Sequence, residues 1–165
     1  MTDQPVEQAA RLHRRLLDRH QTVAVAESLT GGLVAAALTT TPGASATFRG
    51  GLVVYATDLK ARLAGVPESL LARVGAVDAQ VALELARGVR DRLSASWGVG
   101  VTGVAGPDPQ DGRAVGTVFV AAVGPRSVGE TVSELRLAGD RNSIRAQSVA
   151  GVLALLLNVT EQPPI

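Results

Sequence analysis

The chain has 165 residues, enough for one domain with a substantial core, and 46% of them are apolar while only 2% are aromatic. The 16 basic and 15 acidic side chains give a net charge of +1, which argues against a broad nucleic-acid surface, and the few rings argue against base-stacking platforms. The lack of cysteine excludes disulfides and thiol chemistry, and no apolar run reaches the length of a membrane span.

Hydrophobic periodicity, together with Gly and Pro punctuation, predicts an alternation of helices and strands. In chain order we predict a helix (5–19), a strand (22–26), a helix (32–40), a strand (50–55), two short helices (59–63 and 68–74), a longer helix capped by Asp78, a strand (98–103), a hairpin (116–124 with 132–139) and a last helix (141–158). Residues 159–165 are expected to form a tail.

This order predicts a single α/β domain with three layers, α/β/α, around a mixed and partly parallel sheet. The first three strands are expected to be mostly parallel, with antiparallel strands added. In such sheets the ligand crevice lies beyond the carboxyl ends of the parallel strands. The most unusual polar groups of the sequence follow those three strand ends.

The first strand ends in the run "AESLTGG", which begins at residue 26 and contains Glu27. Ser28 and Thr30 either cap the following helix or belong to a site for acyl transfer. In the second interpretation Ser28 is a nucleophile, and the backbone N–H groups of Gly31 and Gly32 bind an oxyanion at the helix N-terminus.

Lys60 is the only lysine of the chain, since the other basic residues are arginines. An arginine cannot lose its proton near neutral pH, whereas burial can lower the pKa of a lysine far enough for it to act as a base. Ser–Lys pairs replace Ser–His pairs in some hydrolases. Ser45 is either a turn residue or a second candidate nucleophile, and Tyr55 either donates a hydrogen bond or packs at its strand end.

The third strand ends in "VTGVAGP", which places Thr102 and Gly103 at the same edge of the sheet. The glycines and proline of this run would make a turn whatever the function. "GVGVTG" has the spacing of a dinucleotide-binding fingerprint, but it lies within the strand and no helix follows it. We therefore reject that interpretation.

"GDRNSIR" predicts a helix start with Asp140 as N-cap and with Arg141 and Arg145 one turn apart. Cations in a first helical turn oppose the helix dipole. That arrangement is favourable if an anion such as phosphate binds there. The alternative is a pair of surface arginines that pair with Asp140 or Glu134.

The runs "AESLTGG", "PGAS", "YATDLK", "GAV", "VTGVAGP" and "GDR" occur in this order and together resemble the CinA C-terminal domain family, over roughly residues 12–157. The resemblance is to its stand-alone nicotinamide mononucleotide deamidases, also called competence/damage-inducible proteins. It implies hydrolysis of the carboxamide of nicotinamide mononucleotide to nicotinate mononucleotide and ammonia, in pyridine-nucleotide salvage. It implies no metal or organic cofactor.

The resemblance also implies roles for individual residues. The matching active-site residues are Ser28, Ser45, Tyr55 and Lys60, and the matching substrate-contacting residues are Thr30, Thr102 and the "GDR" run with Arg145. The chain departs from the family pattern at Leu29, Asp58 and Asp78, where cysteine, asparagine and serine are common. Asp58 is expected to add a carboxylate near Lys60 and to favour the protonated amine.

The favoured mechanism is attack by a serine on the carboxamide, with Lys60 as general base and then as proton donor to ammonia. The sequence does not select between Ser28 and Ser45. The rival hypothesis is a non-catalytic nucleotide-binding or interaction module linked to DNA uptake or damage. We expect a cytoplasmic homo-oligomer, namely a dimer, with a pyridine mononucleotide as ligand and neither nucleic acid nor a membrane as partner.

Overall fold

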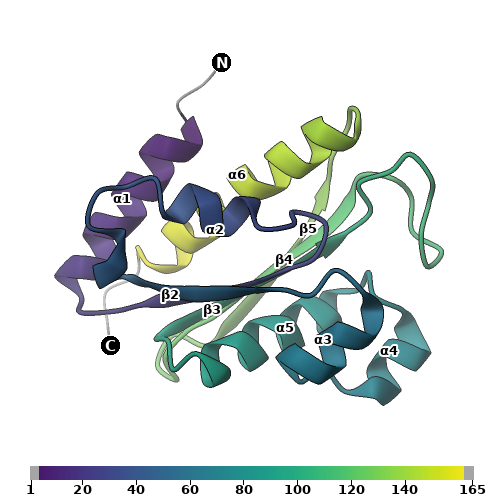
Figure 1. Ribbon diagram of the computed structural model, residues 1–165, viewed down its shortest axis with the longest axis horizontal. Helices are drawn as coiled ribbons and strands as arrows, with labels where there is room; N and C mark the ends of the chain where they lie inside the picture. Colours follow the sequence, from purple (N-terminus) through teal and green to yellow (C-terminus); the bar gives the residue numbers. More distant parts are fainter. Residues whose placement is uncertain (1–3, 162–165) are drawn as a thin grey trace.

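The chain alternates helices and strands around one central sheet. A computed structural model describes residues 4–161, with the elements α1 (Gln4–Asp18), β1 (Val23–Glu27), α2 (Leu33–Leu38), η1 (Ala44–Ala46), β2 (Phe48–Val53), α3 (Thr57–Ala64), α4 (Glu68–Val74), α5 (Ala79–Arg92), β3 (Trp97–Gly103), β4 (Thr117–Val123), β5 (Glu130–Arg136) and α6 (Arg141–Val159). The strand order is β2-β1-β3-β4-β5. Helices α1, α2 and α6 cover one face and α3, α4 and α5 the other (Figure 1), which confirms the predicted α/β/α layers.

The three strands β1, β2 and β3 run parallel, and β4 and β5 are added antiparallel. Every residue of β1 and β3 is buried, because helices cover both faces of the sheet there. Glu27 at the end of β1 pairs with Val53 of β2 on one side and Val101 of β3 on the other. The carboxyl ends of the three parallel strands therefore meet at one edge, as predicted.

Element boundaries differ from the prediction where side chains take up backbone groups. Helix α2 ends at Leu38, because the Thr39 hydroxyl donates to the carbonyls of Ala35 and Ala36. The predicted tail begins too early, since Thr160 is buried and its hydroxyl donates to the Leu156 carbonyl at 2.6 Å. Residues 162–165 of that tail lie outside the described part of the chain.

Helix α5 packs directly on β3 at two glycines. A Cβ atom at Gly98 would lie 1.9 Å from the Ala86 carbonyl oxygen, and one at Gly100 would lie 2.2 Å from the Ala82 carbonyl oxygen. Neither position has room for a methyl group. The glycines of "GVGVTG" thus allow close contact between a helix and a strand.

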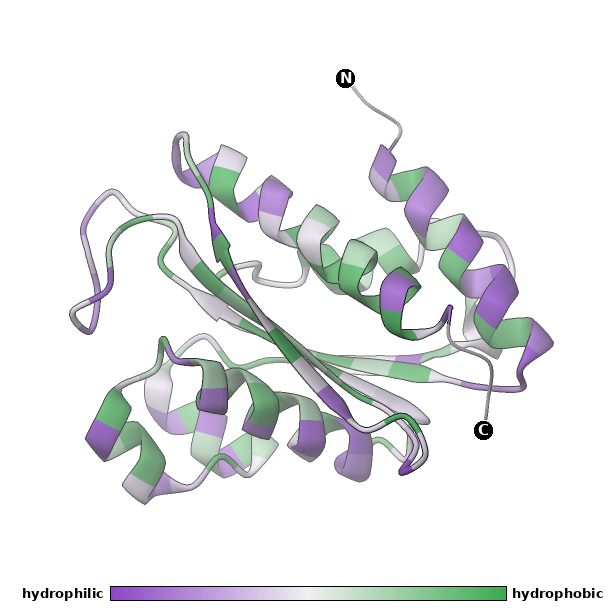
Figure 2. Ribbon diagram, turned by 180° about the vertical axis from the view of Figure 1, so that it is seen from behind, coloured by the Kyte–Doolittle hydropathy of each residue, from purple (hydrophilic) through white to green (hydrophobic). Residues whose placement is uncertain are grey.

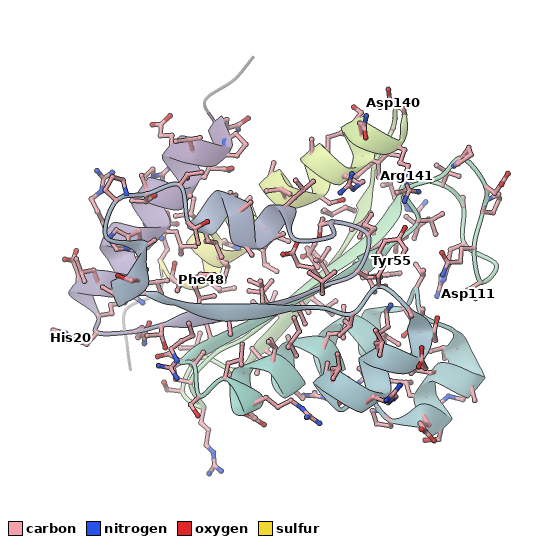
Figure 3. All side chains as sticks on the ribbon, viewed as in Figure 1. His20, Phe48, Tyr55, Asp111, Asp140 and Arg141 are labelled. Atoms are coloured by element: carbon pink, nitrogen blue, oxygen red, sulfur yellow. The ribbon has the colours of Figure 1, made fainter. Side chains whose placement is uncertain are left out.

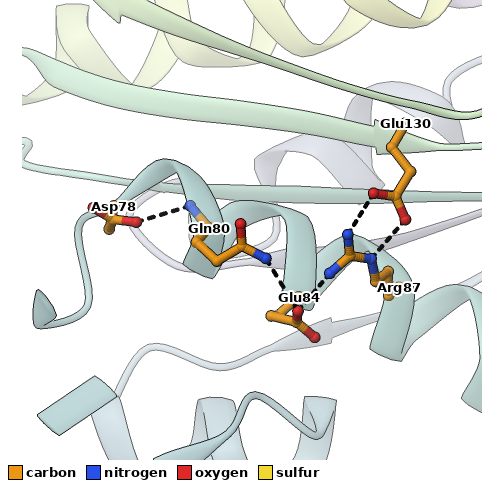
Figure 4. Close-up of polar contacts among 5 residues, drawn as sticks. All are labelled: Asp78, Gln80, Glu84, Arg87 and Glu130. Atoms are coloured by element: carbon orange, nitrogen blue, oxygen red, sulfur yellow. Dashed lines mark hydrogen bonds and ion pairs between the residues drawn. The ribbon is translucent and has the colours of Figure 1, made fainter. Parts of the chain in front are cut away.

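Polar contacts hold the start and the middle of α5 (Figure 4). The Asp78 carboxylate accepts a hydrogen bond from the Gln80 amide at 2.8 Å, which confirms the predicted N-cap. Farther along the helix, Arg87 bonds both Glu84 and Glu130, the first residue of β5. This arginine holds the pKa of the Glu130 carboxyl below its usual value and ties α5 to the edge of the sheet.

The apolar core lies on both faces of the sheet, and Figure 2 shows hydrophobic residues along the central strands of the ribbon. One core lies under α1, α2 and α6 and includes Leu12, Val25 and Leu153. A second lies under α3, α4 and α5 and includes Leu70 and Leu85. Within residues 4–161 no helix combines the length and the apolar character needed to cross a membrane.

The contact between α5 and β3 generates a stability prediction. Gly100→Ala should lower the free energy of unfolding by about 3 kcal/mol, because the added methyl overlaps helix backbone that cannot move aside. Gly129→Ala is the control: its φ is +83° but nothing lies within 4 Å, so the cost should be about 1 kcal/mol. Denaturant titration measures both values, and equal losses would contradict the packing argument.

Candidate active site

A pocket lies at the sheet edge where the carboxyl ends of β1, β2 and β3 meet. Its cavity volume is about 90 Å³, and it is lined by Ser28, Leu29, Tyr55, Gly103, Val104, Ala105, Gly106, Asp108, Gln110 and Arg141. The lining thus comes from three strand ends, the loop after β3 and the start of α6. The structure therefore brings together Ser28, Tyr55, Gly103 and Arg141 from the sequence-predicted set.

Lys60 lies behind Ser28, in the first half of α3, and only 1% of its surface is exposed. Its Nζ atom is 3.0 Å from Ser28 Oγ, 2.8 Å from the Val54 carbonyl oxygen and 3.3 Å from the Tyr55 carbonyl oxygen. Burial lowers the pKa of this amine to about 8, although the negative charge of Asp111 partly opposes the shift. The amine is therefore poised to change protonation state near neutral pH.

Three oxygens surround Lys60 Nζ and match the three N–H donors of the ammonium, and the same geometry also accommodates the neutral amine. A neutral amine has two N–H donors and one lone pair, so donation to the Val54 and Tyr55 carbonyls leaves the lone pair for the Ser28 hydroxyl. With a pKa of about 8, about one amine in ten is neutral at pH 7. The pair can therefore move a proton from Ser28 to Lys60.

The carboxylate that acts on Lys60 is not the one expected from the sequence. Asp58 is exposed and lies 3.6 Å from Arg62, its partner one turn along α3. The charge that raises the Lys60 pKa comes instead from Asp111, in the loop after β3. The expectation that Asp58 would hold Lys60 protonated is therefore wrong, because Asp58 faces solvent on its helix.

Asp111, labelled in Figure 3, is held in place by a hydrogen bond from the loop before α5. It has a left-handed backbone with φ of 50°, and its carboxylate accepts a hydrogen bond from the Ala76 amide at 2.9 Å. The Ala76 carbonyl in turn accepts from the Thr102 hydroxyl at 2.7 Å. Thr102 is buried and does not line the pocket with Ser28; its hydroxyl joins β3 to this loop.

Glu27, rather than a hydroxyl, caps the start of α2. Its buried carboxylate accepts hydrogen bonds from the amides of Gly32 at 3.2 Å, Val34 at 2.9 Å and Ala35 at 3.0 Å. The Gly31 amide donates to the Ser28 carbonyl at 3.0 Å. The predicted oxyanion site at Gly31 and Gly32 is therefore wrong, because both N–H groups already have acceptors within the protein.

The capping interpretation of Ser28 and Thr30 is also wrong. The N-cap of α2 is Gly32, and no side chain at that position supplies the cap. Thr30 Oγ1 is buried and has no hydrogen-bond partner among the described residues, and Thr30 does not line the pocket. Ser28 remains available to Lys60 because Glu27 satisfies the helix terminus in its place.

Ser45 lies at the amino-terminal end of the parallel strands, whereas the pocket lies at their carboxyl ends. This serine is an exposed residue of η1, just before β2 begins at Phe48, and Phe48 pairs with the first residue of β1. Figure 3 shows Phe48 and Tyr55 toward opposite ends of β2. The prediction that Ser45 shares a pocket with Lys60 is therefore wrong, since the length of β2 separates them.

The two arginines of α6 have different surroundings. Arg141 is exposed at the pocket, where it donates to the Gly106 carbonyl and to the Tyr55 hydroxyl, both at 2.7 Å. Arg145 is half-buried and donates to the Leu29 carbonyl at 2.9 Å and the Thr30 carbonyl at 3.3 Å. Neither forms the surface ion pairs that the alternative interpretation required.

Asp140 acts as predicted at the start of α6. Its carboxylate accepts a hydrogen bond from the Ser143 amide at 2.8 Å. The other predicted partner of these arginines, Glu134, lies 3.3 Å from Arg136 instead. The helix start is thus formed as expected, with Arg141 directed toward Tyr55 (Figure 3).

Sequence reasoning missed the loop between β3 and β4. Asp108 and Gln110 line the pocket, and Asp111 acts on Lys60, but no motif distinguishes these residues from an ordinary polar loop. The second half of this loop also lines a larger cavity of about 440 Å³, together with residues of β4 and β5; its lining is Gly112, Arg113, Ala114, Val115, Gly116, Thr117, Glu134, Arg136 and Leu137. No sequence-predicted site residue lines that larger cavity.

Comparison with known proteins finds similarity along most of the chain. The family model described as CinA C-terminal domain matches residues 6–160. A CinA-like protein of Frankia casuarinae is 51% identical over 141 residues, which is 86% of this chain and 32% of that protein. A putative competence-damage inducible protein of Desulforamulus reducens is 43% identical over 153 residues, 93% of this chain and 36% of that protein. The chain thus spans about a third of these relatives.

Solved structures share the fold at nearly full length. The competence/damage inducible protein CihA from Agrobacterium tumefaciens has a TM-score of 0.92 and 35% identity, over 98% of each chain. A CinA superfamily protein from Escherichia coli has a TM-score of 0.89 and 30% identity, over 96% of this chain and 93% of that one.

The burial of Lys60 predicts a pH dependence of stability. Because the folded pKa of about 8 lies below the unfolded value, the unfolded chain binds more protons between these two values, and the free energy of unfolding should rise with pH from below 8 upward. In Lys60→Met this rise between pH 7.5 and 9.5 should disappear, since the chain has no other lysine. Denaturant titrations across that range measure the slopes, and equal slopes in both proteins would contradict the lowered pKa.

Proposed function

The chain belongs to the CinA C-terminal domain family, and from that premise we propose that it is an amidohydrolase that converts nicotinamide mononucleotide to nicotinate mononucleotide and ammonia. The observation that carries this proposal is the buried hydrogen bond between Lys60 and Ser28, beside a pocket at the sheet edge. The names of the relatives state no activity. The substrate therefore rests on the resemblance of the motifs, and the chemistry rests on the Ser–Lys pair.

In the first step Ser28 attacks the carboxamide carbon. Its Oγ forms the new C–O bond while the hydroxyl proton passes to Lys60 Nζ, 3.0 Å away. The amine accepts the proton because burial has lowered its pKa to about 8. Ser28 is the nucleophile in this proposal, because Ser45 lies at the other edge of the sheet.

The tetrahedral intermediate then collapses and the C–N bond breaks. Lys60 returns the proton to the departing nitrogen, which leaves as ammonia, and an ester to Ser28 remains. Water attacks the ester, gives a proton to Lys60 and releases the carboxylate, and the serine oxygen recovers its proton from Lys60. The sum is one amide and one water converted to one carboxylate and one ammonium.

The oxyanion requires a donor other than the amides of Gly31 and Gly32, which are already bonded. We assign this role to the Leu29 amide, which follows the nucleophile in the chain. Leu29 lines the pocket, and its N–H has no acceptor among the described residues. In many serine hydrolases the amide after the nucleophile has this position.

Arg141 is the proposed phosphate ligand. It is exposed beside the pocket and takes part in no ion pair within residues 4–161, so its charge is available to an anion. Its contacts with Gly106 and Tyr55 fix the position of the guanidinium. The nicotinamide ring then lies toward Ser28 and the phosphate toward the start of α6.

Substitution of Lys60 tests the proposal. Lys60→Arg keeps the charge but cannot lose its proton, so kcat for ammonia release from nicotinamide mononucleotide should fall by about 10²–10⁴. Ser28→Ala should lose a similar factor, because the nucleophile is removed. Ser45→Ala is the matched control and should keep wild-type turnover, since Ser45 lies at the opposite edge of the sheet. Melting curves establish that each variant is folded.

Two results would overturn the proposal. A purified wild-type chain that releases no ammonia from the mononucleotide would favour the non-catalytic binding module. A folded Lys60→Arg variant with near wild-type turnover would remove Lys60 from the mechanism.

A further inference from the structure

Two charged side chains hold residues 28–32, the segment between β1 and α2 that carries Ser28. They are Glu27, at the end of β1, and Arg145, on α6. We propose that both are positioning residues that fix Ser28 against Lys60, and that Arg145 is not a phosphate ligand. This inference rests on the proposed role of Ser28 as nucleophile.

Glu27 precedes the segment, and its carboxylate fixes the end where the segment enters α2. Glu27 is 1% exposed, and its carboxylate accepts hydrogen bonds from three backbone N–H groups, those of Gly32, Val34 and Ala35. Because Glu27 is also the last residue of β1, these bonds join the start of α2 to the end of the central strand. Ser28 lies immediately after this anchor, and its amide donates to the Val101 carbonyl of β3 at 3.1 Å.

Arg145 fixes the middle of the segment from α6. Its Nε donates to the Leu29 carbonyl and its Nη2 to the Thr30 carbonyl. The guanidinium lies close to the backbone at Gly31, where a Cβ atom would be 3.3 Å from Nη2 and φ is +57°. Glycine at position 31 therefore lets the backbone of the segment approach the Arg145 guanidinium closely.

Apart from the Ser28 hydroxyl, which bonds Lys60, the side chains between β1 and α2 do not supply this restraint themselves. Thr30 Oγ1 is buried without a partner in the described chain, and Leu29 has no polar side-chain atom. Besides the backbone bonds of Ser28 and Gly31, the side-chain contacts to the backbone between β1 and α2 come from one carboxylate and one guanidinium. A displacement of about 1 Å in a reacting group can cost about 100-fold in rate, so the restraint matters to Ser28.

Arg145 differs from Arg141 in what it offers an incoming anion. Two of its nitrogens are directed at backbone carbonyls, it is half-buried, and it does not line the pocket. Arg141, one turn earlier on α6, is exposed and does line the pocket. The two arginines therefore have separable effects on catalysis.

Steady-state kinetics on two substrates separates these effects. On nicotinamide mononucleotide and on nicotinamide riboside, which lacks the phosphate, Arg145→Gln should lower kcat by about 100-fold with KM changed only a few-fold. Arg145→Lys should recover part of kcat on both, because an ammonium can restore one of the two bonds. Glu27→Gln should resemble Arg145→Gln, since an amide has only one acceptor oxygen for three donors.

Arg141→Gln provides the contrast and Arg49→Gln the control. Arg141→Gln should raise KM for the mononucleotide by about 10-fold to 100-fold and leave the riboside little changed. Arg49 is exposed and donates to the Leu93 carbonyl at 2.9 Å, at the opposite edge of the sheet, so its loss should leave both substrates unaffected. A phosphate-dependent rise in KM for Arg145→Gln, without loss of kcat on the riboside, would overturn the proposal.

Hydrogen exchange gives a readout that does not depend on turnover. In Arg145→Gln and Arg145→Lys the amides of Gly31 and Gly32 should exchange faster than in the wild type, with the larger increase in the glutamine variant. If the wild type lacks amidase activity, the proposed function fails while this measurement still tests the restraint. Unchanged exchange in folded Arg145→Gln would overturn the positioning role.

Discussion

The burial of one amine determines how the candidate site is built. Lys60 lies in the interior with its Nζ between Ser28 and two backbone carbonyls, and burial holds its pKa at about 8. A buried ammonium is costly unless its donors are bonded, so the ends of β1 and β2 must remain where these oxygens are. Asp111, fixed by the Ala76 amide, keeps the pKa from falling further. The pair is therefore balanced between a charged and a neutral state.

The helix start beside Ser28 is satisfied from within the protein. A free helix N-terminus attracts anions, but here the carboxylate of Glu27 already accepts three of the backbone donors of α2. This arrangement closes an apparent anion site and joins the start of α2 to the end of β1, next to Ser28. The anion is expected instead at Arg141, where an exposed guanidinium adjoins the pocket. In this account Glu27 supports the backbone beside Ser28, and Arg141 binds the phosphate of the substrate, at the same end of the parallel strands.

The sequence predicted the layers, the parallel centre of the sheet and the edge at which the site lies, because these follow from hydrophobic periodicity and from the rule on strand ends. It also identified Lys60, since a lone lysine among arginines has a distinct chemistry. It could not show that Glu27 would take the amides of α2, because a carboxylate beside hydroxyls and glycines fits several capping patterns. It placed Ser45 with Ser28, although β2 separates them, and it missed Asp111, which reaches the site only through the conformation of a loop.

The pH dependence of kcat/KM for ammonia release from nicotinamide mononucleotide tests the central claim most directly. This ratio reports the ionisation of groups in the free enzyme. If the neutral form of Lys60 takes the serine proton, the ratio should rise about tenfold per pH unit below the pKa and level off above pH 8. A ratio that does not change between pH 6 and 9, or that rises only near the usual lysine pKa of about 10.4, would contradict the account.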